Sequence, residues 1–179
     1  MKTVSILIPS YNEEKTILNV LEKVNEQKVA GFDFEVIVID DGSTDGTVDL
    51  LKNNKKLYSS LIVLDSNNGK GAAIREGLDQ ASGEYILFQD ADLEYDPADY
   101  QKLLVPIQRF SADIVMGSRM VAPEYTRVSY FWNKVGNRLI TLLFNALNNS
   151  SFTDIYSCYL VYRRELFDAK ELLSKGWEQ

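Results

Sequence analysis

The sequence contains no histidine and a single cysteine, Cys158. Without histidine, a Ser-His-Asp triad, a Cys-His dyad, an imidazole general base and a histidine zinc site are all excluded. Acid–base chemistry is left to carboxylates, lysine, tyrosine or cysteine. One cysteine cannot form an intrachain disulfide, which fits a reducing compartment. Its place in an aromatic, strand-like run predicts a core position for Cys158.

Long apolar runs are also missing. The most apolar segment, residues 139–147, is interrupted by Thr141 and Asn145, so no run reaches the length of a membrane span. The apolar part of the first residues is too short for a signal peptide and leads directly into strand-like sequence. The net charge of −7 argues against nucleic acid as a partner. We therefore expect a cytoplasmic protein that touches a membrane, if at all, from its inner face.

Three acids at alternate positions, Asp90, Asp92 and Glu94, follow the apolar run 85–88 after one glutamine. In an extended chain alternate side chains point to the same side, so these carboxylates can converge on one point. They would repel one another there, and a hard divalent cation with a preference for oxygen ligands would relieve the repulsion. The pattern predicts a Mg²⁺ or Mn²⁺ site. The alternative is a strand that runs into an acidic, solvated loop.

Apolar runs alternate with amphipathic segments along most of the chain. The predicted strands are residues 4–8, 34–39, 61–64, 85–88 and 112–116, and a helix is predicted after each of the first four. Such alternation predicts an α/β domain with a largely parallel, Rossmann-like sheet flanked by helices. A chain of 179 residues is long enough for one such domain.

Polar clusters follow the predicted strands. They are residues 9–13, 40–45, 67–70, 90–94 and 117–119. In open sheets of this kind ligands bind beyond the carboxyl ends of the strands, so the clusters predict a binding site there.

Local signals give some element boundaries. Ser10 or Asn12 is expected to cap the first helix, and Asp96-Pro97 to begin a helix that runs to about residue 110. The remaining predictions are an amphipathic helix over 132–147, a strand over 156–162 and a last helix over 166–173.

Five short motifs occur in a fixed order: IPSYNE at 8–13, DDGSTDGT at 40–47, NGKG at 68–71, DAD at 90–92 and GSR at 117–119. Over essentially the whole chain this set resembles the family 2 glycosyltransferases of GT-A fold, above all the dolichyl- or polyprenyl-phosphate hexose synthases. The resemblance implies inverting transfer of a hexose from a GDP- or UDP-linked donor, with Mg²⁺ or Mn²⁺. The implied acceptor is a polyprenyl phosphate or, alternatively, a growing glycan.

The resemblance also implies how the single domain, 1–179, is divided. Residues 1–119 correspond to the nucleotide-sugar-binding half, and residues 120–179 to part of the acceptor-binding half. Relatives usually continue past the equivalent of Trp177-Glu178, so we expect a chain that is truncated at its C-terminus.

On the donor side the resemblance assigns Asp92 and Glu94 to the metal most directly, while Asp90 shares the metal or contacts the ribose. Three residues of the first strand end, Pro9, Tyr11 and Glu13, correspond to the nucleoside site. Asp41 corresponds to a contact with the base, and Lys70 to a contact with the donor phosphates. For these residues the alternatives are ordinary turn chemistry, capping and, for Lys70, a surface lysine.

On the acceptor side the resemblance assigns Arg119 to the lipid phosphate, which a guanidinium can grip with two hydrogen bonds. Asp154 corresponds to an acid near the acceptor. It would act as a base toward a hydroxyl, but would only orient a phosphate that is already ionised. The polyprenyl branch places a second arginine shortly after a tryptophan. Here Asn133 follows Trp132, and Arg127 or Arg138 is the candidate substitute.

Two other functions stay open at this stage. One is a catalytically silent module that binds a nucleotide sugar. The other is a nucleotidyltransferase, whose glycine-rich basic loop should follow the first strand, where this chain has residues 9–13 instead. The nucleotide base, the sugar and the oligomeric state are also open.

Overall fold

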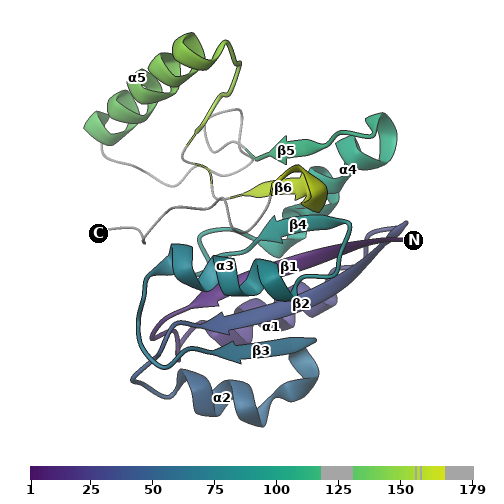
Figure 1. Ribbon diagram of the computed structural model, residues 1–179, viewed down its shortest axis with the longest axis vertical. Helices are drawn as coiled ribbons and strands as arrows, with labels where there is room; N and C mark the ends of the chain where they lie inside the picture. The colour runs from purple at the N-terminus through teal and green to yellow at the C-terminus, as the bar shows by residue number, and fades with distance from the viewer. Residues whose placement is uncertain (118–130, 156, 158, 168–179) are drawn as a thin grey trace.

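A six-stranded sheet forms the centre of the computed structural model, which describes residues 1–117, 131–155, 157 and 159–167 (Figure 1). The strands are β1 (Lys2–Ser10), β2 (Phe32–Asp40), β3 (Ser60–Val63), β4 (Tyr85–Phe88), β5 (Ile114–Met116) and β6 (Leu160–Arg163). Their order is β3-β2-β1-β4-β6-β5. The first four strands are parallel, and β6 lies antiparallel between β4 and β5. The predicted α/β class with a mostly parallel sheet is confirmed.

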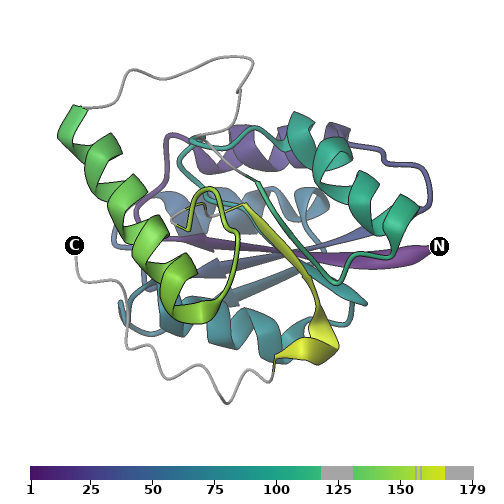
Figure 2. The ribbon, with the colours of Figure 1, turned by 90° about the horizontal axis from the view of Figure 1, so that it is seen from above.

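Helices cover both faces of this sheet (Figure 2). The helices are α1 (Ile17–Glu26), α2 (Thr47–Asn53), α3 (Lys70–Gln80), α4 (Tyr100–Phe110) and α5 (Phe131–Asn148), and the 3-10 turns are η1 (Lys55–Leu57), η2 (Pro97–Asp99) and η3 (Arg164–Leu166). Apolar residues of α1 and α4 pack on one face of the sheet, and those of α3 pack on the other. The sheet is therefore the middle layer of three.

The residues of β1 belong to two apolar clusters, one on each face of the sheet. Ile6 and Ile8 belong to the cluster with α1 and α4, while Leu7 belongs to the cluster with α3. A parallel strand that is covered on both sides has to be apolar at successive positions, as β1 is. Helix α3 approaches the sheet closely at Gly77, where a Cβ atom would lie 2.8 Å from Cδ1 of Ile39.

Helix α5 stands apart from the other helices, beyond the carboxyl ends of the parallel strands (Figures 1 and 2). Its bounds confirm the amphipathic helix predicted over 132–147. Several large apolar side chains on it are exposed: Trp132, Val135, Leu139, Ile140, Leu142, Leu143 and Leu147. Within the described ranges, no helix combines the length and the apolar character needed to cross a membrane.

Some of the predicted helix boundaries are confirmed and others are wrong. Asp96 begins η2 as predicted, since its carboxylate accepts the Ala98 N–H at 3.1 Å, and α4 ends at Phe110. The cap predicted at Ser10 or Asn12 is wrong, because α1 begins only at Ile17. Of the last helix predicted over 166–173, the structure describes only Leu166, which ends the 3-10 turn η3, and Phe167. Residues 168–173 lie outside the described residues, as does Cys158.

Glu35 links β2 by hydrogen bonds to β1 and to the connection between α3 and β4. Its carboxylate accepts hydrogen bonds from the Ser5 hydroxyl and from the Ser82 N–H and hydroxyl, the last two at 2.9 and 2.7 Å. Burial alone would raise the pKa of Glu35, but the hydrogen bonds from Ser5 and residues 82–83 lower it below its usual value.

The lowered pKa makes part of the fold's stability depend on pH. Ionised Glu35 stabilises the fold above about pH 4.5, and this contribution is lost as the pH falls through the lower folded-state pKa. The free energy of unfolding, measured with urea, should fall between about pH 6 and about pH 3 in wild type. We expect a smaller fall over the same pH range in Glu35→Gln. Glu22→Gln, at an exposed position of α1, is the control. The same pH dependence in Glu35→Gln and wild type would contradict this account.

Candidate functional site

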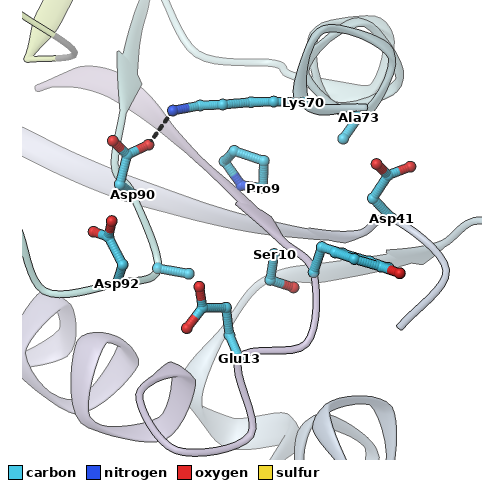
Figure 3. A pocket seen from close by; sticks show the side chains of 10 residues that line it. Pro9, Ser10, Glu13, Asp41, Lys70, Ala73, Asp90 and Asp92 are labelled. Carbon is cyan, nitrogen blue, oxygen red and sulfur yellow. Dashed lines mark hydrogen bonds and ion pairs between the residues drawn. The ribbon is translucent and has the colours of Figure 1, made fainter. Parts of the chain in front are cut away.

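A pocket lies at the carboxyl ends of β1 and β4, beside the start of α3 (Figure 3). It is lined by Pro9, Ser10, Tyr11, Glu13, Asp41, Lys70, Ala73, Asp90, Ala91 and Asp92. Apart from Ala73, these residues come from four of the five polar clusters that the sequence placed at strand ends. Asp41 lies at one end of the pocket, and Asp90 and Asp92 lie at the other.

The segment after β1 is held by hydrogen bonds to the segment after β2. The side chain of Asn12 accepts the Thr44 N–H at 2.8 Å, and the Glu13 N–H donates to the Thr47 hydroxyl at 2.9 Å. Asn12 adopts a left-handed backbone conformation with φ of 56°. These crossed contacts fix the rim of the pocket where Tyr11 and Glu13 lie, and they explain why Asn12 does not cap α1.

Asp41 connects the end of β2 to the loop before α3. Its two carboxylate oxygens accept the N–H groups of Asn68 and Gly69, at 2.9 and 2.8 Å. Gly42 has φ of 71°, and a Cβ atom there would lie 2.6 Å from the Ser66 carbonyl carbon. The buried Asp41 carboxylate thus positions the loop that begins α3. Each of its oxygens has a second lone pair with which a ligand can be bound.

Lys70 spans the pocket. Its side chain runs from the start of α3 past Pro9 and forms an ion pair with Asp90 (Figure 3). The side chain of Lys70 is 32% exposed and that of Asp90 is 14% exposed, so the pair is partly shielded from water. Lys70 is therefore a pocket residue and not the isolated surface lysine of the alternative interpretation.

The acidic segment is a turn, because the extended geometry of β4 ends at Phe88. Leu93 has φ of 64°, and the Glu94 N–H donates to the Asp92 carboxylate at 3.0 Å. The expected alternation of an extended chain is therefore wrong for residues 91–94. Asp90 and Asp92 line the pocket, whereas Glu94 is exposed and does not.

Gln89 holds this turn in place from its buried side. It was not predicted as part of the site. It is fully buried, and its amide nitrogen donates to the carbonyl oxygens of Asp90 and Tyr95 at 3.0 and 3.1 Å. Its amide oxygen accepts the hydroxyls of Tyr100 and Tyr159, at 2.9 and 3.2 Å. A glutamine between an apolar strand and an acid pair was the signal that could have identified it.

Acidic groups outnumber basic ones in the pocket. Among the described residues that line it, Glu13, Asp41, Asp90 and Asp92 are acidic and Lys70 alone is basic. Carboxylate oxygens such as those of Asp90 and Asp92 suit a hard divalent cation, so the donor set fits Mg²⁺ or Mn²⁺. Across the described ranges, however, no group of three or more acidic, cysteine or histidine side chains is already arranged to hold a metal ion. Any such ion would need a ligand from the substrate or from water.

Of the predicted acceptor residues that the structure describes, none lines this pocket. Asp154 lies in the segment that connects α5 to β6, is buried, and is not among the lining residues. Nearby, the Ile155 N–H donates to the Thr141 hydroxyl of α5 at 3.4 Å. Arg138 is exposed on α5, and Arg119 and Arg127 lie outside the described residues.

Comparison with known proteins gives a family match. The model of the family described as Glycosyl transferase family 2 matches residues 5–169. Glycosyltransferase AglJ of Haloferax volcanii is 36% identical over 178 residues, covering 97% of this chain and 54% of AglJ. The undecaprenyl-phosphate 4-deoxy-4-formamido-L-arabinose transferase of Yersinia enterocolitica is 31% identical over 174 residues, covering 94% of this chain and 51% of the transferase. The chain thus spans about half the length of these curated relatives.

Solved structures show the same fold. TarS of S. aureus in complex with UDP-GlcNAc has a TM-score of 0.65 and 26% identity, covering 93% of this chain and 46% of that one. Glucosyl-3-phosphoglycerate synthase of Mycobacterium tuberculosis, in complex with Mn²⁺, UDP and glucosyl-3-phosphoglycerate, has a TM-score of 0.69 and 24% identity, covering 92% of this chain and 58% of that one. The predicted GT-A fold is confirmed.

Proposed function

The chain belongs to glycosyl transferase family 2, and from this premise we propose that it binds a nucleotide sugar together with a divalent cation. The sugar is a hexose linked to UDP or GDP, and it is transferred with inversion to a polyprenyl phosphate. The observation that carries the proposal is the pocket at the strand ends, with four carboxylates and one lysine among its described lining residues. A nucleoside diphosphate is an anion and needs added positive charge to enter such a site.

The two ends of the pocket suit different parts of the donor. We assign the nucleoside to the end formed by Pro9, Tyr11 and Asp41, with Glu13 on the same rim. The diphosphate then lies at the other end, within reach of Lys70. The TarS complex with UDP-GlcNAc supports a nucleotide sugar as the ligand of this fold.

Asp90 and Asp92 are the residues proposed to hold the cation. Glu94, the third predicted ligand, does not line the pocket, so the remaining ligands would come from the substrate or from water. When bound, Mg²⁺ or Mn²⁺ supplies Lewis-acid stabilisation of the negative charge that develops on the departing diphosphate. Lys70 adds a positive charge to the same leaving group. Gln89 keeps the acidic turn in place through its hydrogen bonds to the carbonyl oxygens of Asp90 and Tyr95.

We base the proposed acceptor on the names of the relatives. The Yersinia relative is named for transfer to undecaprenyl phosphate. A phosphate monoester with a second pKa of about 6 is ionised near neutral pH and needs no base, so Asp154 would orient it. Arg119 would bind its oxygens. The exposed apolar residues of α5 would meet the inner face of the membrane that carries such a lipid.

A transfer assay tests this proposal. The protein is incubated with Mn²⁺, undecaprenyl phosphate in detergent and radiolabelled UDP-glucose, UDP-GlcNAc or GDP-mannose, and lipid-linked sugar is extracted and counted. We expect one donor to label the lipid, and we expect no product when EDTA replaces the metal. Labelling of a glycan in place of the lipid would contradict the proposed acceptor.

A second function is favoured by the position of Asp154, the predicted acceptor-side acid, which is buried and does not line the donor pocket. A nucleotide-sugar-binding module without transfer activity would need the donor pocket but not the acceptor half. Metal-dependent binding of the nucleotide sugar without release of the sugar to any acceptor would establish this function.

A further inference from the structure

The ion pair between Lys70 and Asp90 occupies a carboxylate that the proposed function assigns to the metal (Figure 3). An ammonium group and a divalent cation that share one carboxylate repel each other. Partial burial of the pair limits the screening of this repulsion by water and salt. The ion pair with Lys70 therefore weakens the binding of a metal ion at Asp90.

The pair is held in place from both sides by the fold. Lys70 is the first residue of α3, and the loop before it is fixed by the hydrogen bonds of Gly69 and Asn68 to Asp41. The carbonyl oxygen of Asp90 accepts the side-chain N–H of Gln89. Two anchored backbones thus bring the ammonium and the carboxylate together, in contrast to an exposed pair of freely moving side chains.

We propose that the Lys70 ammonium is a built-in counter-ion of Asp90 and makes metal binding depend on the nucleotide. Lys70 neutralises Asp90 in the free pocket and opposes binding of a divalent cation alone. A nucleoside diphosphate offers Lys70 its phosphate oxygens as new partners, and Asp90 is then released to the metal. This inference rests on the proposed donor site and adds to it a positive coupling between metal and nucleotide.

The test compares Mn²⁺ binding by wild type, Lys70→Met and the control Lys52→Met, measured calorimetrically and from the electron paramagnetic resonance signal of free Mn²⁺. Lys52 is exposed on α2 and does not line the pocket, so its replacement removes the same charge elsewhere. We expect Lys70→Met to bind Mn²⁺ alone about 5-fold more tightly or better, the lower end of typical coupling between two sites. Wild type and Lys52→Met should bind it equally weakly.

The same titrations are repeated with saturating UDP and with saturating GDP. The nucleotide that binds should tighten Mn²⁺ binding by about 10-fold or more in wild type, and by clearly less in Lys70→Met. Mn²⁺ affinity in Lys70→Met that equals that of Lys52→Met, or undiminished coupling, would overturn the inference while leaving the donor site intact. Failure of wild type to bind either nucleotide with Mn²⁺ would overturn both the inference and the proposed function.

Discussion

Asp92→Asn is expected to weaken metal-dependent binding of the nucleoside diphosphate by about 100-fold or more, and to abolish transfer. Asp92 lines the pocket on an exposed turn, where an amide of nearly the same shape fits without changing the fold. The amide oxygen can still accept the Glu94 N–H that Asp92 accepts at 3.0 Å. What is lost is the negative charge that a hard cation requires.

The measurement is calorimetric titration with the nucleotide and Mn²⁺, accompanied by a thermal unfolding curve. Asp33→Asn is the matched control, since Asp33 is an exposed residue near the start of β2, at the opposite end of the strand from the pocket. Asp92→Asn should unfold within about 2 °C of wild type, because exposed substitutions rarely change stability. Full nucleotide binding in Asp92→Asn would contradict the assignment of this carboxylate to the metal.

Gln89→Leu is expected to lower the free energy of unfolding by about 3 kcal/mol or more. Leucine fills a similar volume but cannot hydrogen-bond, so it leaves the carbonyl oxygens of Asp90 and Tyr95 and the hydroxyl of Tyr100 without their buried partner. Each such buried group costs about 1–3 kcal/mol. For a domain of this size the loss corresponds to a fall in Tm of about 6–12 °C.

Urea unfolding measures this loss, and Gln80→Leu provides the control. Gln80 is exposed at the end of α3 and makes one side-chain contact, accepting the Ser60 hydroxyl at 3.0 Å. Its replacement should change stability by less than about 0.5 kcal/mol. A loss below about 1 kcal/mol in Gln89→Leu would mean that the amide network contributes little to the fold.

The sequence predicted the parallel strands because short apolar runs alternate with amphipathic segments, as expected when helices cover both faces of a sheet. It also predicted that Asp90, Asp41 and Lys70 would meet, because the ends of parallel strands share one edge of the sheet. Helix α4 was predicted to within its first turn from the start signal Asp96-Pro97.

The features that the sequence did not reveal depend on contacts between distant segments. Asn12 has the chemistry of a helix cap, but its side chain bonds to Thr44, and no local pattern distinguishes the two uses. Of the strand predicted over 156–162, residues 160–162 form part of β6, whose antiparallel place between β4 and β5 follows from tertiary packing. Tyr159, just before β6, reaches Gln89 and so couples that strand to the acidic turn.

The central claim is that this pocket binds one nucleoside diphosphate through a divalent cation. Calorimetric titration of the protein with UDP, GDP, CDP and ADP, each with and without Mn²⁺, tests it most directly. We expect one of the four to bind selectively, and only when the metal is present. Equal binding with and without Mn²⁺, or binding of none of the four, would contradict it.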